Sequence, residues 1–194
     1  LVFGLVFLSV SFQNIFGQGV NVSAISGNTT EAGGPATFTV TLDSEPTDDV
    51  TIALSSSDIG EGTVTPSVIK TPANWNTNTT VTVTGVDDAI VDGDIGYTII
   101  TGNVTSSDAS YNALNGAAVA DVSVINTDND VVGINVSAIS GNTTEAGGPA
   151  TFAITLGSQP TNNVTIALSS SNTGEGTVAA SVLKTPANWN TNTT

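Results

Sequence analysis

Residues 36–42 have the sequence ATFTVTL and residues 79–86 have the sequence TTVTVTGV. In both stretches apolar side chains alternate with threonine, so each strand would present one apolar and one polar face. Similar β-branched runs recur along the chain between turn-forming stretches rich in Gly, Asn, Asp and Pro. The pattern predicts seven short strands and one long loop at 102–116, with the strands over residues 20–26, 36–42, 50–56, 63–70, 79–86, 95–101 and 117–126.

The spacing of these strands indicates the fold class. No stretch shows the long 3.6-residue apolar period of a helix, so we expect an all-β chain. Seven short strands at this spacing favour an immunoglobulin-like Greek-key β-sandwich, in which two sheets bury their apolar faces against each other. The 194 residues and 39% apolar content suffice for one such core or two.

The sequence also contains a long internal repeat. The segment NVSAISGNTTEAGGPATF begins at Asn21 and again at Asn135, so the period is 135 − 21 = 114 residues. Residues 21–80 align without a gap on residues 135–194. The alignment predicts tandem sandwich repeats, the first over residues 20–134 and the second, over residues 135–194, truncated to its N-terminal half.

The two copies differ mainly in surface charge. Apolar exchanges are mild, such as Val40 against Ile154. Carboxylates of the first copy are replaced by neutral residues in the second, at Asp43, Glu45, Asp48, Asp49 and Asp58 against Gly157, Gln159, Asn162, Asn163 and Asn172. The core is kept while the surface varies, as expected of an array of duplicated units in a larger protein.

The first residues form a separate apolar segment. Residues 1–12, LVFGLVFLSVSF, are too few to span a bilayer. Small residues follow at Gly17 and Gly19, as at the end of a secretory signal peptide. We therefore interpret residues 1–19 as a signal peptide remnant and expect an extracellular location. The alternatives are a hydrophobic strand of a preceding domain and a donor strand that completes a neighbouring subunit.

Charge and composition exclude several function classes. The chain has 17 acidic residues against Lys70 and Lys184, with no Arg or His, and a net charge of −15. Nucleic acids and anionic membranes are therefore not expected partners, whereas metal cations are. No cysteine is present, which excludes disulfides and thiol chemistry. General acid–base catalysis could use only carboxylates and tyrosines, so we do not expect an enzyme.

Acidic residues gather in loops that the predicted topology brings together. If successive strands alternate in direction, the loops after the first, third and fifth strands and the exit from the seventh lie at one end. Nine carboxylates fall there, at Glu31, Asp58, Glu61, Asp87, Asp88, Asp92, Asp94, Asp128 and Asp130. They would repel one another unless a cation intervened, and calcium takes six to eight oxygen ligands. We expect calcium there, beside the junction at residues 133–135; the alternative is a solvated acidic surface.

Three stretches resemble the Calx-β domain in its bacterial surface-protein form: TEAGGPATFTVTL at residues 30–42, TVTVTGVDDAIVDGDIGYTI at 80–99 and VADVSVINTDND at 119–130. The resemblance covers residues 21–130 in full and 135–194 in part. It implies an immunoglobulin-like sandwich that binds calcium at one end. The implied ligands are Glu31, Asp58, Asp87, Asp88, Asp92, Asp128 and Asp130. In the second copy Glu145 corresponds to Glu31, and Asn172 replaces Asp58.

The expected function is a calcium-stiffened stalk or spacer in an exported, adhesin-like surface protein, with neighbouring repeats of the same chain as partners. Three alternatives remain open: a module that binds a surface glycan or protein, an accessory domain of a large exported enzyme, and a subunit of an extracellular fibre. Trp75 and Trp189, in the repeated sequence TPANWNT, could form an aromatic platform for a sugar or could fold onto the edge of the sandwich.

Overall fold

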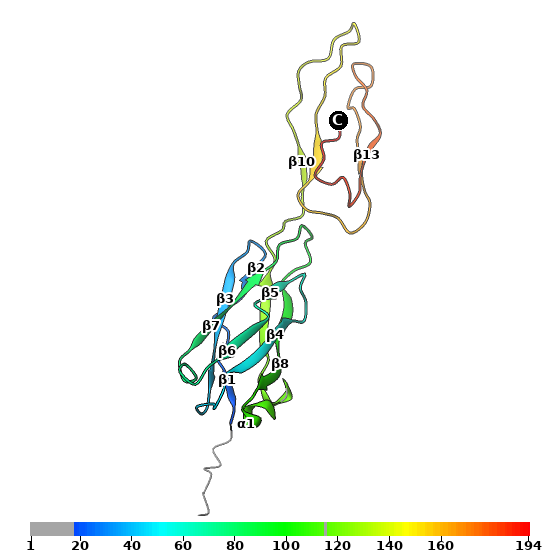
Figure 1. Ribbon diagram of the computed structural model, residues 1–194. Helices are drawn as coiled ribbons and strands as arrows, with labels where there is room; N and C mark the ends of the chain where they lie inside the picture. The colour runs from blue at the N-terminus through cyan, green and yellow to red at the C-terminus, as the bar shows by residue number, and fades with distance from the viewer. Residues whose placement is uncertain (1–17, 115) are drawn as a thin grey trace, which may run out of the picture.

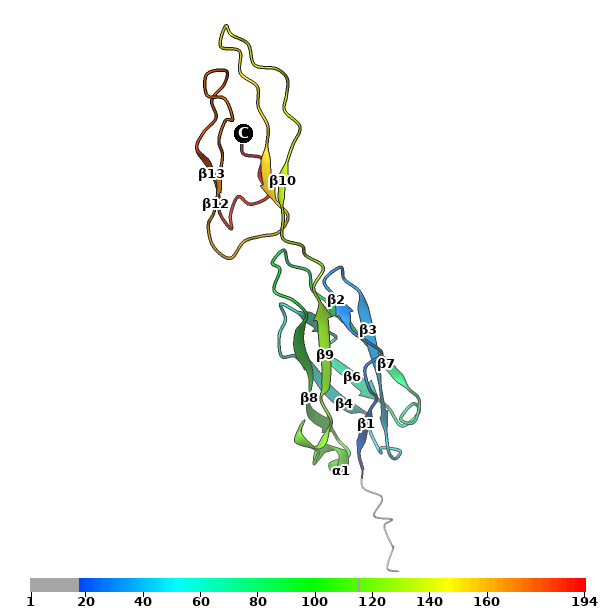
Figure 2. The same ribbon diagram turned by 180° about the vertical axis from the view of Figure 1, so that it is seen from behind.

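The computed structural model describes residues 18–114 and 116–194. The chain is all-β, as predicted, and the two sequence copies follow one another along an elongated molecule (Figures 1 and 2). Almost all of the expected signal peptide remnant, residues 1–17, lies outside the described residues. Within the described ranges, no helix is both long and apolar enough to cross a membrane.

Four of the described strands in the first copy form one antiparallel sheet. In spatial order they are β1 (Val20–Val22), β3 (Pro35–Leu42), β7 (Thr79–Gly85) and β5 (Gly62–Val64). The strands β3 and β7 are the two alternating stretches, and they pair with each other from Pro35 opposite Thr84 to Val40 opposite Thr79. Their threonines therefore share the outer face of this sheet, except for Thr79, which lies opposite the buried Val40.

Five other described strands form the second sheet. In spatial order they are β2 (Thr29–Thr30), β9 (Val122–Thr127), β8 (Ile95–Ser106), β4 (Val50–Ser56) and β6 (Ser67–Lys70). The short strand β2 runs parallel to β9, whereas the other neighbours are antiparallel.

The core lies between these two sheets. Phe38 and Val83 of the first sheet and Ile52 and Ile99 of the second are each at most 1% exposed and belong to one apolar cluster. Along β3 the apolar residues are buried and the threonines are only partly covered, which is the alternation that the sequence predicts. Burial of these side chains stabilises the sandwich by roughly 1.5–3 kcal/mol each.

The predicted strand over residues 63–70 is wrong as a single element. The chain crosses from one sheet to the other at Pro66, so that β5 pairs with β7 and β6 pairs with β4. Proline has no N–H to donate to a strand ladder, which favours a break at this point. The Pro66 carbonyl is still used, since it accepts a hydrogen bond of 2.8 Å from Leu54 N.

The predicted loop over residues 102–116 is wrong as well. The strand β8 continues to Ser106 and is followed by the helices α1 (Ala109–Asn112) and η1 (Gly116–Ala118), and β9 begins at Val122 rather than Ala117. With β2 and the division of residues 63–70, the described part of the first copy has nine strands rather than seven.

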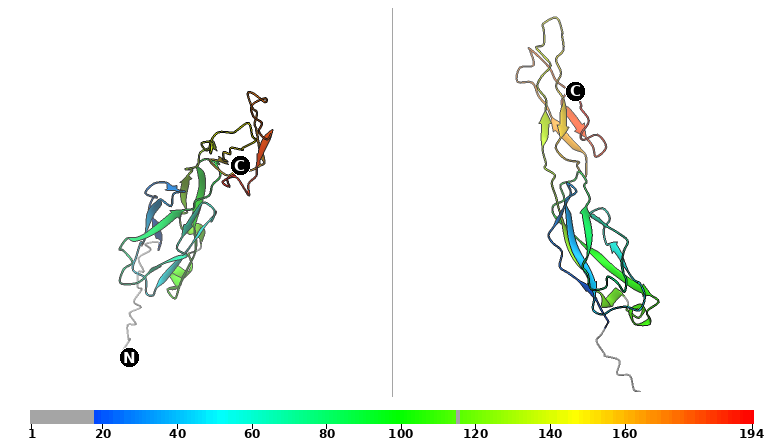
Figure 3. Two further views of the ribbon diagram at one scale, coloured as in Figure 1. Left: turned by 90° about the horizontal axis from the view of Figure 1, so that it is seen from above. Right: turned by 60° about the vertical axis from the view of Figure 1, so that its left-hand side comes forward.

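The second copy reproduces part of this arrangement. The strand β10 (Ile134–Val136) pairs with β11 (Ile154–Leu156), and β12 (Val164–Ala167) pairs with β13 (Ser181–Lys184). These registers equal those of β1 with β3 and β4 with β6, shifted by 114 residues. The segments between them are long and irregular, as Figure 3 shows.

Both copies bury their lysine in the same way. Lys70 and Lys184 are 0% exposed, and the Lys70 Nζ donates to the Thr77 carbonyl and to Thr79 Oγ1. These bonds hold the loop that contains Trp75 in place. The backbone carbonyl of Trp75 also accepts a hydrogen bond of 2.9 Å from Leu42 N. The Trp75 side chain is half-buried and packs against the core, which favours its interpretation as an edge-packing residue.

Candidate metal site at the junction between the copies

Three acidic segments meet at the end of the first copy that faces the second copy (Figure 1). They are the turn after β2, the loop between β7 and β8, and the segment after β9. The parallel pairing of β2 with β9 sets their alignment, because Thr30 lies opposite Thr127. Glu31 and Asp128 each follow one of these paired residues and are thereby placed side by side. The Glu31 N–H extends the pairing, with a hydrogen bond of 3.1 Å to the Thr127 carbonyl.

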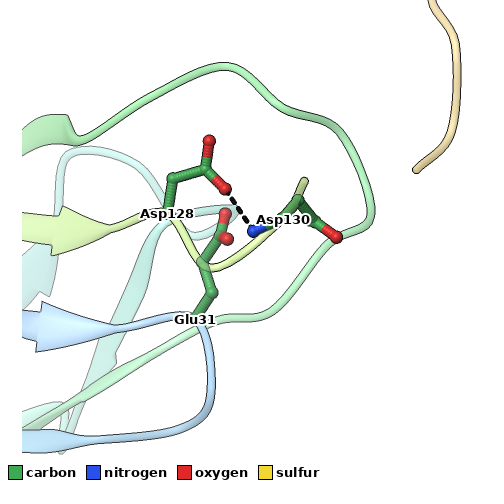
Figure 4. Close-up of side chains that lie close together, drawn as sticks. All are labelled: Glu31, Asp128 and Asp130. Atoms are coloured by element: carbon green, nitrogen blue, oxygen red, sulfur yellow. Dashed lines mark hydrogen bonds between the residues drawn. The ribbon is translucent and has the colours of Figure 1, made fainter. Parts of the chain in front are cut away.

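Glu31, Asp128 and Asp130 form a compact carboxylate cluster (Figure 4). Each offers one carboxylate oxygen, and these oxygens lie within 4.8 Å of one another. Glu31 is only 3% exposed, and its Oε2 accepts a hydrogen bond of 3.0 Å from Asn129 N. Asp128 Oδ1 accepts a hydrogen bond of 2.7 Å from Asp130 N. Asp130 Oδ2 is buried and has no hydrogen-bond partner among the described residues.

The electrostatics of the cluster are unfavourable in the absence of a cation. Burial raises the pKa of Glu31, and the negative charges of nearby aspartates raise it further, while the hydrogen bond from Asn129 opposes the shift. Burial also raises the pKa of Asp130, with an added contribution from the charge of Asp128. The pKa of Asp128 is lowered, because the N–H groups of Asp130 and Gly93 donate to it. A bound cation would favour the charged form of all three.

The other predicted ligands are not part of this cluster. Asp87 is linked to it through Asn129, whose Nδ2 donates to Asp87 Oδ1 at 3.3 Å. Two of the remaining aspartates accept hydrogen bonds within their own loops: Asp88 from Ile90 N at 2.6 Å and Asp58 from Gly60 N at 2.9 Å. The third, Asp92, is exposed to solvent. The structure thus gathers three of the seven predicted ligands and connects a fourth.

A buried polar pair supports the same end of the molecule and was not predicted from the sequence. Asn126 is 1% exposed and Thr29 is 0% exposed, and Asn126 Oδ1 accepts a hydrogen bond of 3.0 Å from Thr29 Oγ1. Asn126 Nδ2 donates to the Val86 carbonyl at 2.9 Å and to Glu61 Oε2 at 3.3 Å. This side chain therefore ties β2, β9 and the start of the β7–β8 loop together. Its position two residues after Val124, on the buried face of β9, is the signal that could have revealed it.

No protein-family model matches this sequence, and no curated protein matches it. What the site can bind is therefore inferred from its own ligand atoms. The sequence has no His or Cys, so every side-chain ligand of the cluster is a hard carboxylate oxygen, which suits calcium or magnesium rather than zinc or copper.

The spacing of the carboxylates suits calcium. Calcium–oxygen distances are about 2.3–2.6 Å, so ligands on opposite sides of one ion lie up to about 5 Å apart. The three oxygens, which all lie within 4.8 Å of one another, are close enough to share one calcium ion. The partnerless Asp130 oxygen is an available ligand, and backbone carbonyls and water would complete the coordination. Magnesium keeps several of its waters and uses fewer protein ligands, which makes it the weaker candidate.

Proposed function

We propose that this chain belongs to an exported surface protein built from tandem immunoglobulin-like repeats of the Calx-β type, in which calcium at the junction stiffens the array. The observation that carries the proposal is the cluster of Glu31, Asp128 and Asp130, in which one buried Asp130 oxygen has no donor among the described residues. A buried carboxylate oxygen without a partner is costly, and a bound cation would compensate for it.

The order of the strands supports the immunoglobulin-like part of the proposal. If β1, β3, β4, β5, β7, β8 and β9 are taken as strands A to G of such a sandwich, the first sheet has the order A-B-E-D and the second contains G-F-C. The first order and the central three strands of the second match the immunoglobulin constant-type sandwich, to which β2 and β6 are added here at the two edges of the second sheet. The three motifs that resemble Calx-β domains fall on β3, on β7 to β8 and on β9.

The position of the cluster supports stiffening. Asp130 is separated from β10 by only three residues. A cation bound by both Asp128 and Asp130 would therefore fix the chain where it enters the second copy. The second copy also contacts the loop that follows β7, through a hydrogen bond of 2.6 Å from Gln159 N to the Ala89 carbonyl. A cation that orders both segments would restrain the hinge between the copies.

The biological role that we propose is a stalk or spacer that projects a binding part of a larger protein away from the cell. The apolar segment at residues 1–12 supports export. The strongly acidic surface is compatible with an environment rich in calcium. No catalytic activity is part of the proposal, and the partners within the array are the neighbouring repeats.

The proposal is tested by thermal unfolding of the chain in millimolar calcium and in chelator. Calcium at 100 times its dissociation constant would stabilise the first copy by about 2.7 kcal/mol, which corresponds to a rise in Tm on the order of 10 °C. The rise should be lost in the double variant Asp128→Asn/Asp130→Asn. The matched control is Asp48→Asn/Asp49→Asn, which removes the same charge in the loop between β3 and β4, and it should retain the rise.

Calorimetric titration gives the second readout. We expect calcium to bind the parent chain and the control variant, with a markedly weaker response to magnesium at equal concentration. Equal Tm values in calcium and chelator for the parent chain, with no heat of binding, would reduce the cluster to a solvated acidic surface and remove the stiffening role.

A further inference from the structure

The loop that the second copy turns toward the first copy has lost all its carboxylates. Aligned positions of the two copies exchange an acidic for a neutral residue five times, always in the same direction. Four of the five exchanges fall in one loop, which connects β11 to β12, at Gly157, Gln159, Asn162 and Asn163. The equivalent loop of the first copy, between β3 and β4, has Asp43, Glu45, Asp48 and Asp49 at these positions.

The neutral loop lies against the acidic end of the first copy. Together they line a groove of about 500 Å³ between the copies. Ile90 and Val91 line it from the β7–β8 loop, and Gln159, Asn162 and Asn163 line it from the second copy. The backbone hydrogen bond from Gln159 to Ala89 lies at the same place. The two surfaces are thus in direct contact.

Charge explains why this loop is neutral. The β7–β8 loop carries Asp87, Asp88, Asp92 and Asp94 within eight residues. The groove residues of this loop, Ile90 and Val91, lie between Asp88 and Asp92 in the sequence. Carboxylates at positions 159, 162 and 163 would add negative charge on the opposite side of the groove, and like charges at an interface disfavour association. The amides of Gln159, Asn162 and Asn163 keep the size of the acidic side chains and remove the repulsion.

Steric fit explains why the second copy has glycine at position 157. A Cβ atom at Gly157 would lie 2.7 Å from the Val131 carbonyl oxygen and 3.2 Å from Gly133 N, both backbone atoms of the connecting segment. Any side chain there would displace that segment. The first copy has Asp43 at this position, and its carboxylate instead accepts a hydrogen bond from Asn21 Nδ2.

We infer that positions 157, 159, 162 and 163 form a docking face for the acidic end of a preceding repeat, and that this loop determines which repeats can follow one another. A unit with the loop of the second copy fits onto an acidic end such as that of the first copy. A unit with the loop of the first copy, with Asp43, Glu45, Asp48 and Asp49, is rejected by such an end. This selection rests on the charge and size of the loop and does not depend on the proposed stalk role.

The test measures the geometry between the copies in the whole chain. Since the chain has no cysteine, spin labels can be attached at T82C on β7 and T165C on β12, both exposed positions. Pulsed electron paramagnetic resonance in millimolar calcium then gives the distribution of distances between the copies. We expect one narrow peak for the parent chain. The variant Gly157→Asp/Gln159→Glu/Asn162→Asp/Asn163→Asp, which gives the second copy the loop of the first, should lose this peak.

Two controls separate docking from folding. The reverse exchange in the first copy, Asp43→Gly/Glu45→Gln/Asp48→Asn/Asp49→Asn, should leave the peak in place. Labels at N142C and T165C, both within the second copy, should give the same distribution in the parent and the fourfold variant. If the fourfold variant fails this folding control, the double variant Asn162→Asp/Asn163→Asp takes its place. It should broaden the distance distribution between the copies, and 1 M salt should reverse that broadening, because the screening length is then about 3 Å. An unchanged narrow peak in the variant, or a broad distribution in the parent, would overturn the inference.

Discussion

Asp108 is expected to be a principal stabilising residue at the end of the first copy remote from the junction. It is 6% exposed and caps the N-terminus of α1, where its Oδ1 accepts hydrogen bonds from Ser110 N at 2.9 Å and Tyr111 N at 3.4 Å. Its Oδ2 accepts from Thr47 N at 2.9 Å and Thr47 Oγ1 at 3.0 Å. One carboxylate therefore connects α1 to the loop between β3 and β4.

The cost of Asp108→Ala can be estimated from these contacts. Loss of an N-cap costs about 1 kcal/mol. The two bonds from Thr47 to a charged acceptor add about 1–2 kcal/mol together, since Thr47 is exposed and water can replace them in part. We expect a total of about 2–3 kcal/mol, or a Tm lower by roughly 10 °C. Asp108→Asn keeps a capping oxygen and should cost about half as much.

The pH dependence has a definite sign. The pKa of Asp108 is lowered from 3.8, chiefly because Thr47 N donates to the carboxylate. The folded state therefore favours the charged form, so the contribution is complete above the unfolded pKa and is lost as the pH falls through the lower, folded value. The difference between the parent and Asp108→Ala should be full at pH 7 and should shrink below about pH 4.

Urea unfolding at pH 7, 5 and 3, followed by circular dichroism, checks both statements. Asp48→Asn is the control, because Asp48 is exposed and accepts only from its neighbour, Asp49 N. It should change the free energy of unfolding by less than about 0.5 kcal/mol. The account of Asp108 is refuted if Asp108→Ala costs no more than this control at pH 7, or if its cost at pH 3 equals that at pH 7.

Four other substitutions test separate parts of the structure. Glu31→Gln should stabilise the chain in chelator, because it removes a buried charge beside two carboxylates, and should weaken calcium binding; thermal unfolding and calorimetry measure the two effects. Gly85→Ala should cost about 1–3 kcal/mol in urea unfolding, since its Cβ would lie 2.3 Å from the Thr30 carbonyl oxygen. Lys70→Met should cost about 1–3 kcal/mol by removing the hydrogen bonds from Nζ to the Thr77 carbonyl and Thr79 Oγ1, whereas Lys184→Met should not affect unfolding of the first copy.

The sequence pattern predicts a strand correctly where the two-residue alternation of apolar and polar side chains is enough to define it. The alternation over residues 36–42 and 79–86 matches β3 and β7 to within one residue, because the two faces of each strand differ in polarity along their whole length. The division at Pro66 is different. Residues 62–64 and 67–70 have similar strand propensity, and only their partners, β7 and β4, decide that they belong to different sheets.

The candidate site was likewise predicted only as far as local pattern allows, because its final geometry depends on pairing between distant strands. Counting strand directions correctly placed Glu31 and Asp128 at one end, since it depends only on alternation. The pattern could not show that β2, a strand of two residues with no visible period, pairs with β9 and brings the carboxylates within 4.8 Å. Nor could it show that Asp58 and Asp88 accept N–H groups of their own loops, a local use that is common for aspartate in turns.

The two copies provide an internal test of how far local sequence decides. Glu31 and Glu145 lie in the identical sequence TEAGG. Glu31 is nonetheless only 3% exposed, whereas Glu145 is exposed to solvent. The difference is the segment after β9, whose Asn129 N–H bonds to Glu31, and no such segment lies beside Glu145 among the described residues. Burial of the carboxylate, its raised pKa and its approach to Asp128 all come from that non-local contact. Calcium affinity should therefore belong to the completed sandwich, and titration of this chain should detect binding at the first copy alone.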